Sequence, residues 1–303
     1  MNKQNRVFDL HCDTVSALYD QKLNWDNTAL HLRADAVRPY DEYRQVLAVY
    51  SRNQLDDESC WQRYCDMVNH TLPALRQTVS PAFHGYLAVE GGKLLGGDLS
   101  RLDKMYADGV RILTLVWGGL CCVGGAHDTD EGLTPFGYDV VRRCLTLGIV
   151  PDVSHASDTV FRETAQLAKE AGKPFIASHS DSRALCAHSR NLTDEMFCTV
   201  RDAGGLTGVS LCRNHLSSTP QCTVAAVADH ICHYLSMDGG NTVCLGCDLD
   251  GTAPLPDGLS TAADLYRIAD ELASRGISQT QIDRIFYANA ADFFDKNNIM
   301  PVL

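Results

Sequence analysis

Short runs of apolar residues recur along the whole chain, and longer stretches with a helical pattern separate them. Eight of these runs suit buried strands, and they cover residues 7–10, 46–50, 85–89, 110–116, 149–153, 174–177, 206–211 and 242–245. Strands that alternate with helices pair in parallel through right-handed crossovers. The pattern therefore predicts an α/β fold with a closed (β/α)8 barrel, the TIM-barrel architecture.

The segments between the apolar runs carry the signals of helix ends. Residues 157–172 open on capping residues and close on a glycine, and residues 192–204 follow the same pattern. Two extra C-terminal helices, amphipathic over residues 261–276 and 278–294, are expected to pack against the outside of the barrel. An open doubly wound sheet is the competing arrangement, but no glycine-rich phosphate-binding motif follows the first strand.

Length and charge narrow the choice of architecture and partner. The chain has 303 residues, 45% of them hydrophobic, and no linker rich in proline or serine marks a boundary, so we expect a single domain over residues 1–303. The formal net charge of −12 would repel phosphate backbones and anionic membrane surfaces. Neither nucleic acid nor a membrane is therefore an expected partner.

The amino-terminal residues and the cysteines bear on the cellular location. No apolar signal segment precedes the first strand, so a cytoplasmic location is the expectation. The 13 cysteines are odd in number and scattered through apolar runs, which is typical of reduced thiols rather than a disulfide framework. Cys244 and Cys247 form a C-x-x-C pair, yet their strand-like flanks favour core packing over zinc or redox chemistry.

His11 and Asp13 are the first indication of chemistry. Successive side chains on a strand point to opposite faces, so these two point to one side, where an imidazole and a carboxylate suit a divalent metal. Taken alone, the pair is better explained as a buried histidine and a helix-capping aspartate. His179 and Asp181 repeat the same spacing, so partners elsewhere in the chain must decide.

In a barrel of this kind the reactive residues lie at the carboxyl ends of the strands. Four further residues that bind metals or move protons follow expected strands at that end: Glu90, His155, His179 and Asp248. Singly, each has a plain structural explanation, because Glu90 can begin a loop and His155 can stand beside a helix cap. Their recurrence at the same end of successive strands predicts a metal site.

Five of these side chains can hold two divalent ions. The two sites would share Glu90 as a bridging carboxylate, and would otherwise consist of His11 with Asp13 and of His155 with His179. A water or hydroxide shared by the ions would be the nucleophile, and Asp248 would pass its proton to the leaving group. Asp250 competes with Asp248 for that role, because strand alternation does not decide between them. Amide or ester hydrolysis is the predicted reaction class.

Seven motifs, in this order, resemble the renal or membrane dipeptidase family of metallopeptidases, a branch of the amidohydrolase-like barrels. They are DLHCD (9–13), VEGG (89–92), LTPFG (133–137), DVSHAS (152–157), SHS (178–180), SRN (189–191) and GCDLDG (246–251), and they span most of the chain. The resemblance implies a binuclear zinc site from His11, Asp13, Glu90, His155 and His179.

The same resemblance implies roles for two more residues and for the substrate. Asp248 would be the acid/base, with Glu90 as the other catalytic carboxylate. Arg190 would bind the terminal carboxylate of the substrate, which a guanidinium fork recognises with two hydrogen bonds, although an exposed arginine after a helix is its simpler explanation. Family members hydrolyse dipeptides, often with a D-residue at the carboxyl side, and commonly form homodimers.

Trp117 is a departure from the family. After the fourth strand the family's dipeptidases usually read Thr-Leu-Thr-His, with a histidine that binds substrate and stabilises the oxyanion, whereas residues 114–117 here read TLVW. The indole N–H can donate one hydrogen bond, but a missing oxyanion donor costs several kcal/mol of transition-state stabilisation. His127 could compensate, although a solvated loop histidine is the simpler explanation. The remaining histidines, at 31, 70, 84, 188, 215, 230 and 233, are treated as structural.

Three hypotheses follow. The first is a zinc-dependent dipeptidase that acts on dipeptide-like small molecules and forms a homodimer. The second, motivated by Trp117, is a binuclear metal amidohydrolase acting on a lactam, a cyclic amide or an N-acyl amino acid. The third is a catalytically silent metal-binding relative, which the presence of Asp248 argues against.

Overall fold

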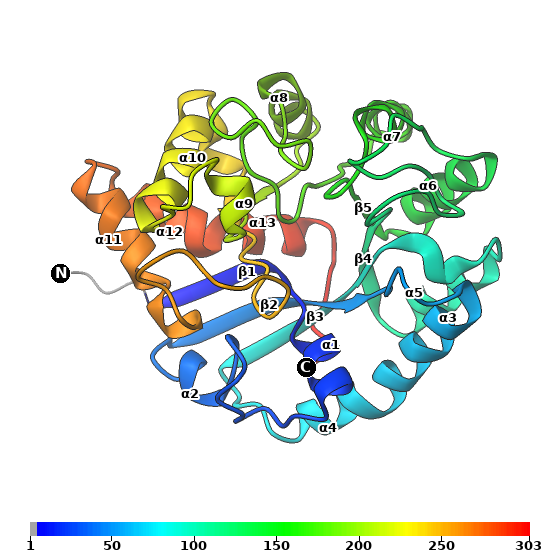
Figure 1. Ribbon diagram of the computed structural model, residues 1–303, viewed down its shortest axis with the longest axis horizontal. Coiled ribbons are helices and arrows are strands. Elements are labelled where there is room, and N and C mark those ends of the chain that lie inside the picture. Colours follow the sequence, from blue (N-terminus) through cyan, green and yellow to red (C-terminus); the bar gives the residue numbers. More distant parts are fainter. Residues whose placement is uncertain (1–4) are drawn as a thin grey trace.

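The computed structural model describes residues 5–303, and their seven strands form one curled parallel sheet (Figure 1). The strands are β1 (Arg6–Cys12), β2 (Glu42–Tyr50), β3 (Phe83–Glu90), β4 (Val110–Thr114), β5 (Val150–Asp152), β6 (Thr207–Val209) and β7 (Val243–Leu245). Their order in the sheet is β5-β4-β3-β2-β1-β7-β6. The predicted α/β class with parallel pairing is confirmed.

Helices precede or follow most strands and surround the sheet (Figure 1). The α-helices are α1 (Thr14–Gln21), α2 (Ala34–Val37), α3 (Asp57–Asp66), α4 (Leu72–Arg76), α5 (Ser100–Ala107), α6 (Pro135–Leu147), α7 (Asp158–Ala171), α8 (Asp194–Asp202), α9 (Arg213–Leu216), α10 (Val224–Ser236), α11 (Tyr266–Ser274), α12 (Gln279–Asp283) and α13 (Asn289–Lys296). Shorter 3-10 or π segments are η1 (Met67–Thr71), η2 (Gly92–Leu95), η3 (Gly239–Asn241), η4 (Ala262–Asp264) and η5 (Arg284–Ala288).

The sixth expected strand, residues 174–177, is not a regular strand. Ile176 forms an isolated parallel bridge with Asp152 at the end of β5, and Ala177 forms one with Thr207 at the start of β6. The segment is short and begins with Pro174, which has no N–H to donate to a ladder. The described residues therefore contain seven strands rather than the eight predicted, with this segment bridged to both edge strands.

The two helices with clear end signals lie where they are predicted. The Ser157 side chain accepts a hydrogen bond from the N–H of Val160 at the start of α7, and Gly172 ends that helix in the left-handed conformation. Thr193 caps α8 in the same way, accepting from the N–H of Met196. Local side-chain hydrogen bonds thus set these helix boundaries, and a local pattern is enough to predict them.

One face of the sheet carries both a buried apolar cluster and the candidate ligands. Because side chains alternate along a strand, Tyr86, Ala88 and Glu90 of β3 share this face. Apolar residues from all seven strands or their ends form this cluster, called the inward cluster: Phe8, Leu10, Val46, Ala48, Tyr86, Ala88, Ile112, Val150, Leu206 and Cys244. The candidate site therefore stands at the carboxyl end of an apolar interior.

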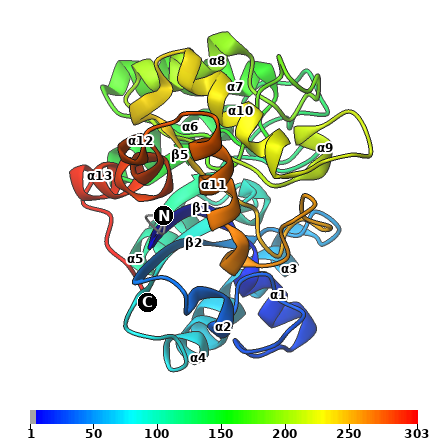
Figure 2. The same cartoon turned by 90° about the vertical axis from the view of Figure 1, so that its left-hand side faces the viewer.

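The second C-terminal helix covers a different layer from the one predicted. The run from α12 through η5 to α13 lies over the inward cluster, and the Phe294 ring is 4.5 Å from Phe8 and 4.9 Å from Tyr86 between ring centroids. It therefore closes the inner face of the sheet near the starts of the strands (Figure 2), whereas α11 packs beside α10 on the outside. Amphipathic periodicity shows that a helix has an apolar face but not which layer that face covers.

The cysteines and the helix lengths add two facts about the described chain. All 13 cysteines are free thiols, and Cys244 and Cys247 are buried in the core as predicted. Within residues 5–303, no helix combines the length and the apolar character that crossing a membrane requires.

Candidate active site

The candidate ligands come from the carboxyl ends of different strands and meet in one place. His11 is the penultimate residue of β1, and Glu90 is the final residue of β3. His155 follows β5, His179 follows the bridged segment at 174–177, and Asp248 follows β7. The structure brings all of them, with Asp13, to one cleft, so residues distant in sequence become neighbours.

Glu90 lies at the centre of this group. Its Oε1 atom is 3.0 Å from His155 Nε2, 3.3 Å from His179 Nε2 and 3.6 Å from His11 Nε2. All three imidazoles therefore lie close to the same carboxylate oxygen. The Glu90 side chain is almost fully buried, so its charge has little contact with bulk water.

The ligand atoms fall into three overlapping sets, within each of which all atoms lie within 4.8 Å of one another. One set is Glu90, His155 and His179, the second is His11, Asp13 and Glu90, and the third is His11, His179 and Asp248. Glu90 belongs to two sets, as a bridging ligand would. Two of the sets have the same members as the two sites inferred from the sequence, whereas the third combines a histidine of each site with Asp248.

The residues present fit metal ions, because two of the ligand atoms lack other partners and two more, His155 Nε2 and His179 Nε2, lie only 3.0 Å apart. His11 Nε2 and Asp13 Oδ1 are buried and have no hydrogen-bond partner among the described residues. The Nδ1 atom of His155 lies 3.0 Å from the carbonyl oxygen of Trp117, which can only accept, so this Nδ1 carries the proton. The Nε2 lone pair of His155 then points at Glu90, where a cation satisfies both groups.

Burial gives these groups unusual acidities. It raises the pKa of Glu90 and of Asp13 well above their usual range, and the charges of neighbouring carboxylates raise both further. Burial also raises the pKa of Asp248 to about 7, against the lowering effect of Arg190. The pKa of His11 falls to about 4, again through burial. Neutral imidazoles and crowded carboxylates are the forms that a divalent cation stabilises.

Two backbone conformations aim the side chains into the cleft. His155 and Asp248 have φ angles of 69° and 56°, in the left-handed region that non-glycine residues rarely adopt. Such strain costs about 1–3 kcal/mol for each residue and concentrates at functional sites. At Gly251, an added Cβ would lie 2.2 Å from Asp13 Oδ2 and from Asp248 Oδ1, so the close approach of these carboxylates requires glycine.

The structure decides between Asp248 and Asp250. The Asp250 carboxylate accepts hydrogen bonds from Thr14 Oγ1 at 2.6 Å and from the N–H of His31 at 2.5 Å, so it holds two loops together. Asp248 Oδ1 instead faces His11 Nε2 at 4.0 Å, and 16% of the Asp248 side chain is exposed to the cleft. Asp248 is therefore the carboxyl group available to move a proton.

Arg190 is buried at the edge of the cleft rather than exposed. One terminal nitrogen donates to Ser180 Oγ and the other to the carbonyl oxygen of His179, both at 3.0 Å. Its Nε has no hydrogen-bond partner among the described residues. No carboxylate of the described chain pairs with this guanidinium, so its charge is available to an anionic group in the cleft.

Trp117 lies in the wall of the cleft, between two other rings. Its ring centroid is 5.0 Å from that of Tyr50 and 5.7 Å from that of His155. Sequence reasoning missed Tyr50, although strand alternation from Val46 and Ala48 places Tyr50 on the same face as the inward cluster. The wall is thus aromatic at the position where the resemblance implies a histidine.

His127 and His215 also line the cleft, contrary to the sequence interpretation. His127 Nδ1 lies 3.0 Å from Ser189 Oγ, and its backbone N–H donates to the carbonyl oxygen of His155 at 2.8 Å, so it is not a freely solvated loop residue. Burial lowers its pKa to about 4. His215, treated as structural, follows the carboxyl end of β6, where the search of strand ends would have found it.

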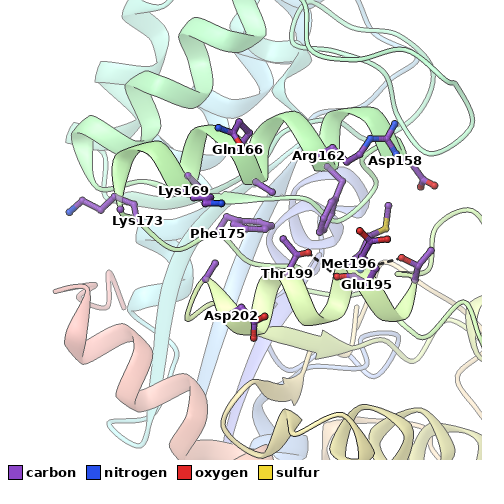
Figure 3. Close-up of a pocket in the computed structure, with 16 residues that line it drawn as sticks. Asp158, Arg162, Gln166, Lys169, Lys173, Phe175, Glu195, Met196, Thr199 and Asp202 are labelled. Atoms are coloured by element: carbon purple, nitrogen blue, oxygen red, sulfur yellow. Dashed lines mark hydrogen bonds between the residues drawn. The ribbon is translucent and has the colours of Figure 1, made fainter.

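A second, larger hollow lies away from this chemistry. The cleft with the candidate ligands has a volume of about 540 Å³, whereas a groove of about 770 Å³ runs between α7 and α8 on the outside of the sheet. Figure 3 shows Lys169 and Gln166 of α7 on one side of this groove and Thr199 and Asp202 of α8 on the other. Its lining residues in the described chain include no histidine or cysteine. Size alone therefore does not locate the site.

Comparison with known proteins places the chain in a family. The family described as "Membrane dipeptidase (Peptidase family M19)" matches residues 1–298. The "Uncharacterized protein in pqqA 5'region" of Klebsiella pneumoniae is 33% identical over 216 residues, which are 66% of this chain and 77% of that protein. Human "Dipeptidase 3" is 32% identical over 218 residues, but these cover 69% of this chain and only 44% of the human protein.

A solved structure shows the same fold. The metallo peptidase from Rhodobacter sphaeroides, whose structure holds a phosphinate mimic of the dipeptide L-Ala-D-Ala, superposes with a TM-score of 0.84 over 96% of this chain and 99% of that chain, at 20% identity. Because the family match spans nearly the whole sequence, this chain belongs to the membrane dipeptidase family, peptidase family M19, a family of metal-dependent hydrolases.

Proposed function

We propose that this chain is a zinc-dependent dipeptidase with two ions in its cleft. The observation that carries the proposal is the position of Glu90 Oε1, which lies within 3.6 Å of three imidazole nitrogens from two different ligand sets. A single carboxylate oxygen shared in this way suits a bridging ligand. Family membership supports a metal-dependent hydrolase, and zinc and the two-ion count are part of the proposal.

The donor types support the choice of metal. His11, Asp13 and Glu90 would hold one ion, and Glu90, His155 and His179 the other. Imidazole and carboxylate ligands suit zinc, although manganese, cobalt and iron accept the same set. When bound, such ions supply Lewis-acid polarisation of a carbonyl oxygen and lower the pKa of water.

The charges of the cleft suggest how a dipeptide lies in it. The buried guanidinium of Arg190 would bind the terminal carboxylate, as the resemblance implies. The peptide carbonyl would then lie over Glu90, and the amino-terminal residue would face Trp117 and Tyr50. The Rhodobacter protein was solved with a mimic of the dipeptide L-Ala-D-Ala. This supports a dipeptide-sized substrate for this chain, with a D-residue allowed at the carboxyl side.

Asp248 would act as the general acid and base. Its carboxyl group is 4.0 Å from His11 Nε2 and open to the cleft, so it can take a proton from attacking water and give it to the leaving amine. In the metal-free protein, burial raises the pKa of this carboxyl group to about 7. Glu90, as the shared carboxylate, would keep the two ligand sets together.

Three further parts of the proposal concern the whole molecule. Residues 174–177 would serve as the eighth strand of a closed barrel, since the N–H of Ile176 donates to Pro151 and that of Ala177 to Leu206, at 3.0 and 2.9 Å. A cytoplasmic location is consistent with 13 free cysteines. A single domain over residues 1–303 and a homodimer stay predictions.

Hydrolysis of defined dipeptides tests the function. Protein loaded with two equivalents of zinc is expected to cleave members of a panel of L,L and L,D dipeptides, and metal removal with a chelator is expected to abolish this cleavage. Zinc should restore it. A loaded protein that cleaves no dipeptide of the panel would contradict the proposal.

Trp117 favours a second candidate, a hydrolase of lactams, cyclic amides or N-acyl amino acids. An aromatic wall with one N–H donor replaces a side chain that could accept and donate, so the preferred amide can differ. Arg190→Lys separates the candidates, because it retains the positive charge but not the bidentate fork. The KM for dipeptides should then rise about 30-fold, or ~2 kcal/mol, while the KM for substrates without a free carboxylate should not change.

A further inference from the structure

The Ser178 hydroxyl lies beneath the ligands of both ion sites. Ser178 is 1% exposed and directly precedes His179. Its Oγ atom is 2.6 Å from Asp152 Oδ2, 2.8 Å from His179 Nδ1 and 3.5 Å from His11 Nδ1. One oxygen therefore contacts one imidazole from each of the two proposed ion sites, at the Nδ1 atom rather than the Nε2 atom that faces Glu90.

Counting protons assigns the direction of these hydrogen bonds. A serine hydroxyl has one hydrogen, and the Asp152 carboxylate can only accept, so the hydrogen of Ser178 lies on its bond to Asp152. Ser178 Oγ must then accept from His179, whose proton is on Nδ1. The Nε2 atom of His179 is left as a lone pair, which points at Glu90 Oε1 3.3 Å away.

Asp152 is held so firmly that this direction cannot reverse. Its Oδ1 accepts from the backbone N–H groups of Ser154 and Ser178, both at 2.9 Å, and its Oδ2 accepts from Thr114 Oγ1 at 2.5 Å. Asp152 is fully buried, so water does not compete for these bonds. Every donor around the carboxylate belongs to the protein, and it serves as the anchor of the hydroxyl.

The rings of His11 and His179 lie together above this hydroxyl. Their centroids are 3.8 Å apart with an angle of 31° between the planes, which lets both Nδ1 atoms approach one oxygen. His11 Nε2 is buried and has no hydrogen-bond partner among the described residues. A proton on His11 Nδ1 therefore leaves that Nε2 as a lone pair for a ligand bond.

We propose that Ser178, anchored by Asp152, is a positioning residue that sets the tautomer of His11 and of His179 together, and so couples the two ion sites through one hydroxyl. The proposal rests on the proposed metal centre. It goes beyond that centre because it assigns Ser178 and Asp152, which belong to none of the ligand sets, a role in holding both ions. Loss of the hydroxyl should then weaken the binding of both ions rather than of one.

Titration of metal-free protein with Co2+ and with Zn2+ tests this coupling. Ser178→Ala is expected to weaken both binding steps by about 10- to 100-fold and to change the visible spectrum of the Co2+ form. Ser178→Thr keeps the hydroxyl and should restore the affinities to within about threefold. Thr114→Val is the matched control, because it removes another hydrogen bond to Asp152 without contact to a histidine.

The outcomes separate this inference from the proposed function. Wild-type protein that binds no ion would overturn both. Wild-type protein that binds two ions, with Ser178→Ala binding them equally tightly, would overturn only the role of Ser178, as would an equal loss in Thr114→Val. Weaker binding of only one ion would contradict the coupling and would mean that Ser178 acts on one histidine.

A second measurement keeps the inference testable if Ser178→Ala does not fold. The 15N chemical shifts of the histidine rings in zinc-loaded wild-type protein report which nitrogen carries the proton. Protonated Nδ1 and metal-bound Nε2 are expected for both His11 and His179. A metal-bound Nδ1 in either ring would contradict the proposal.

Discussion

The cleft has two layers that the chain builds in different ways. The floor consists of the candidate ligands and the acid/base at strand ends: His11, Asp13, Glu90, His155, His179 and Asp248. The wall consists of side chains from loops and a short helix: Trp117, His127, Arg190 and His215. Floor residues follow strand ends whose backbone pairs directly, as where the N–H of Asp248 donates to the carbonyl of His11 at 3.1 Å.

The wall depends more on side-chain contacts. The His127 ring contacts Ser189, in addition to the backbone hydrogen bond of His127 to His155, and Trp117 stacks on Tyr50 and His155. Backbone pairing places a residue with little regard to its neighbours, whereas loop contacts change with any substitution along them. We therefore expect the floor to determine the reaction and the wall to determine the substrate.

Glu90→Gln should have the largest effect. It keeps the shape of the side chain but removes the charge that both ligand sets share, so both ions should be lost and dipeptide cleavage should fall to background. Metal analysis of the purified protein and a dipeptide assay measure the two effects. Retention of two ions by this variant would show that Glu90 is not the shared ligand.

Asp248→Asn should separate chemistry from metal binding. The amide cannot take a proton, so kcat should fall by about 10²- to 10⁴-fold. Two ions should remain, because Asp248 contributes to only one of the three ligand sets. Asp250→Asn is the comparison variant. It should lower thermal stability, since the Asp250 carboxylate accepts hydrogen bonds from Thr14 and from the His31 backbone. Equal kcat for Asp248→Asn and wild type would remove Asp248 from the reaction.

The floor should also make the metal-free protein less stable as pH rises. Burial raises the pKa of Asp248 from 3.8 to about 7, so between these values the folded protein holds a proton that the unfolded chain has released. Stability then falls with rising pH by up to ~1.4 kcal/mol per pH unit for one such carboxyl. Urea unfolding of the metal-free protein at pH 4 to 7 measures this slope, which Asp248→Asn should reduce.

A slope that Asp248→Asn leaves unchanged would assign the effect to other groups. Glu90 and Asp13 act in the same direction, because burial raises their pKa values too. Bound zinc should flatten the slope, since a cation stabilises the charged carboxylates that burial disfavours.

Trp117→Phe should have the smallest effect, confined to the wall. The phenyl ring keeps the aromatic contact with Tyr50 and His155 but lacks the indole N–H. Metal content should be unchanged, and the ratio of kcat/KM between two dipeptides should change by about tenfold at most. Lys169→Ala, in the groove between α7 and α8, is the control and should leave that ratio within about twofold of wild type.

Much of the floor was accessible from the sequence because it follows a local rule. The H-x-D spacing and the positions of Glu90, His155 and Asp248 after apolar runs needed only strand periodicity and the location of active sites in α/β barrels. The helix boundaries of α7 and α8 were equally local, since each cap is a hydrogen bond over three residues. The prediction of a regular strand at 174–177 was wrong, because the chain pairs there through isolated bridges only.

By itself, then, the sequence determined the parallel α/β class, the family and the set of residues that meet at the strand ends, because each of these depends on spacing along the chain. Only the tertiary structure decided that Asp250 is held in hydrogen bonds to Thr14 and His31, whereas Asp248 is open to the cleft. It also decided that α13 covers the inner face and that His127 and His215 line the cleft. It also placed Ser178 beneath two histidines. These outcomes depend on hydrogen bonds and packing between residues far apart in the chain, and no local pattern records which distant partner a side chain reaches.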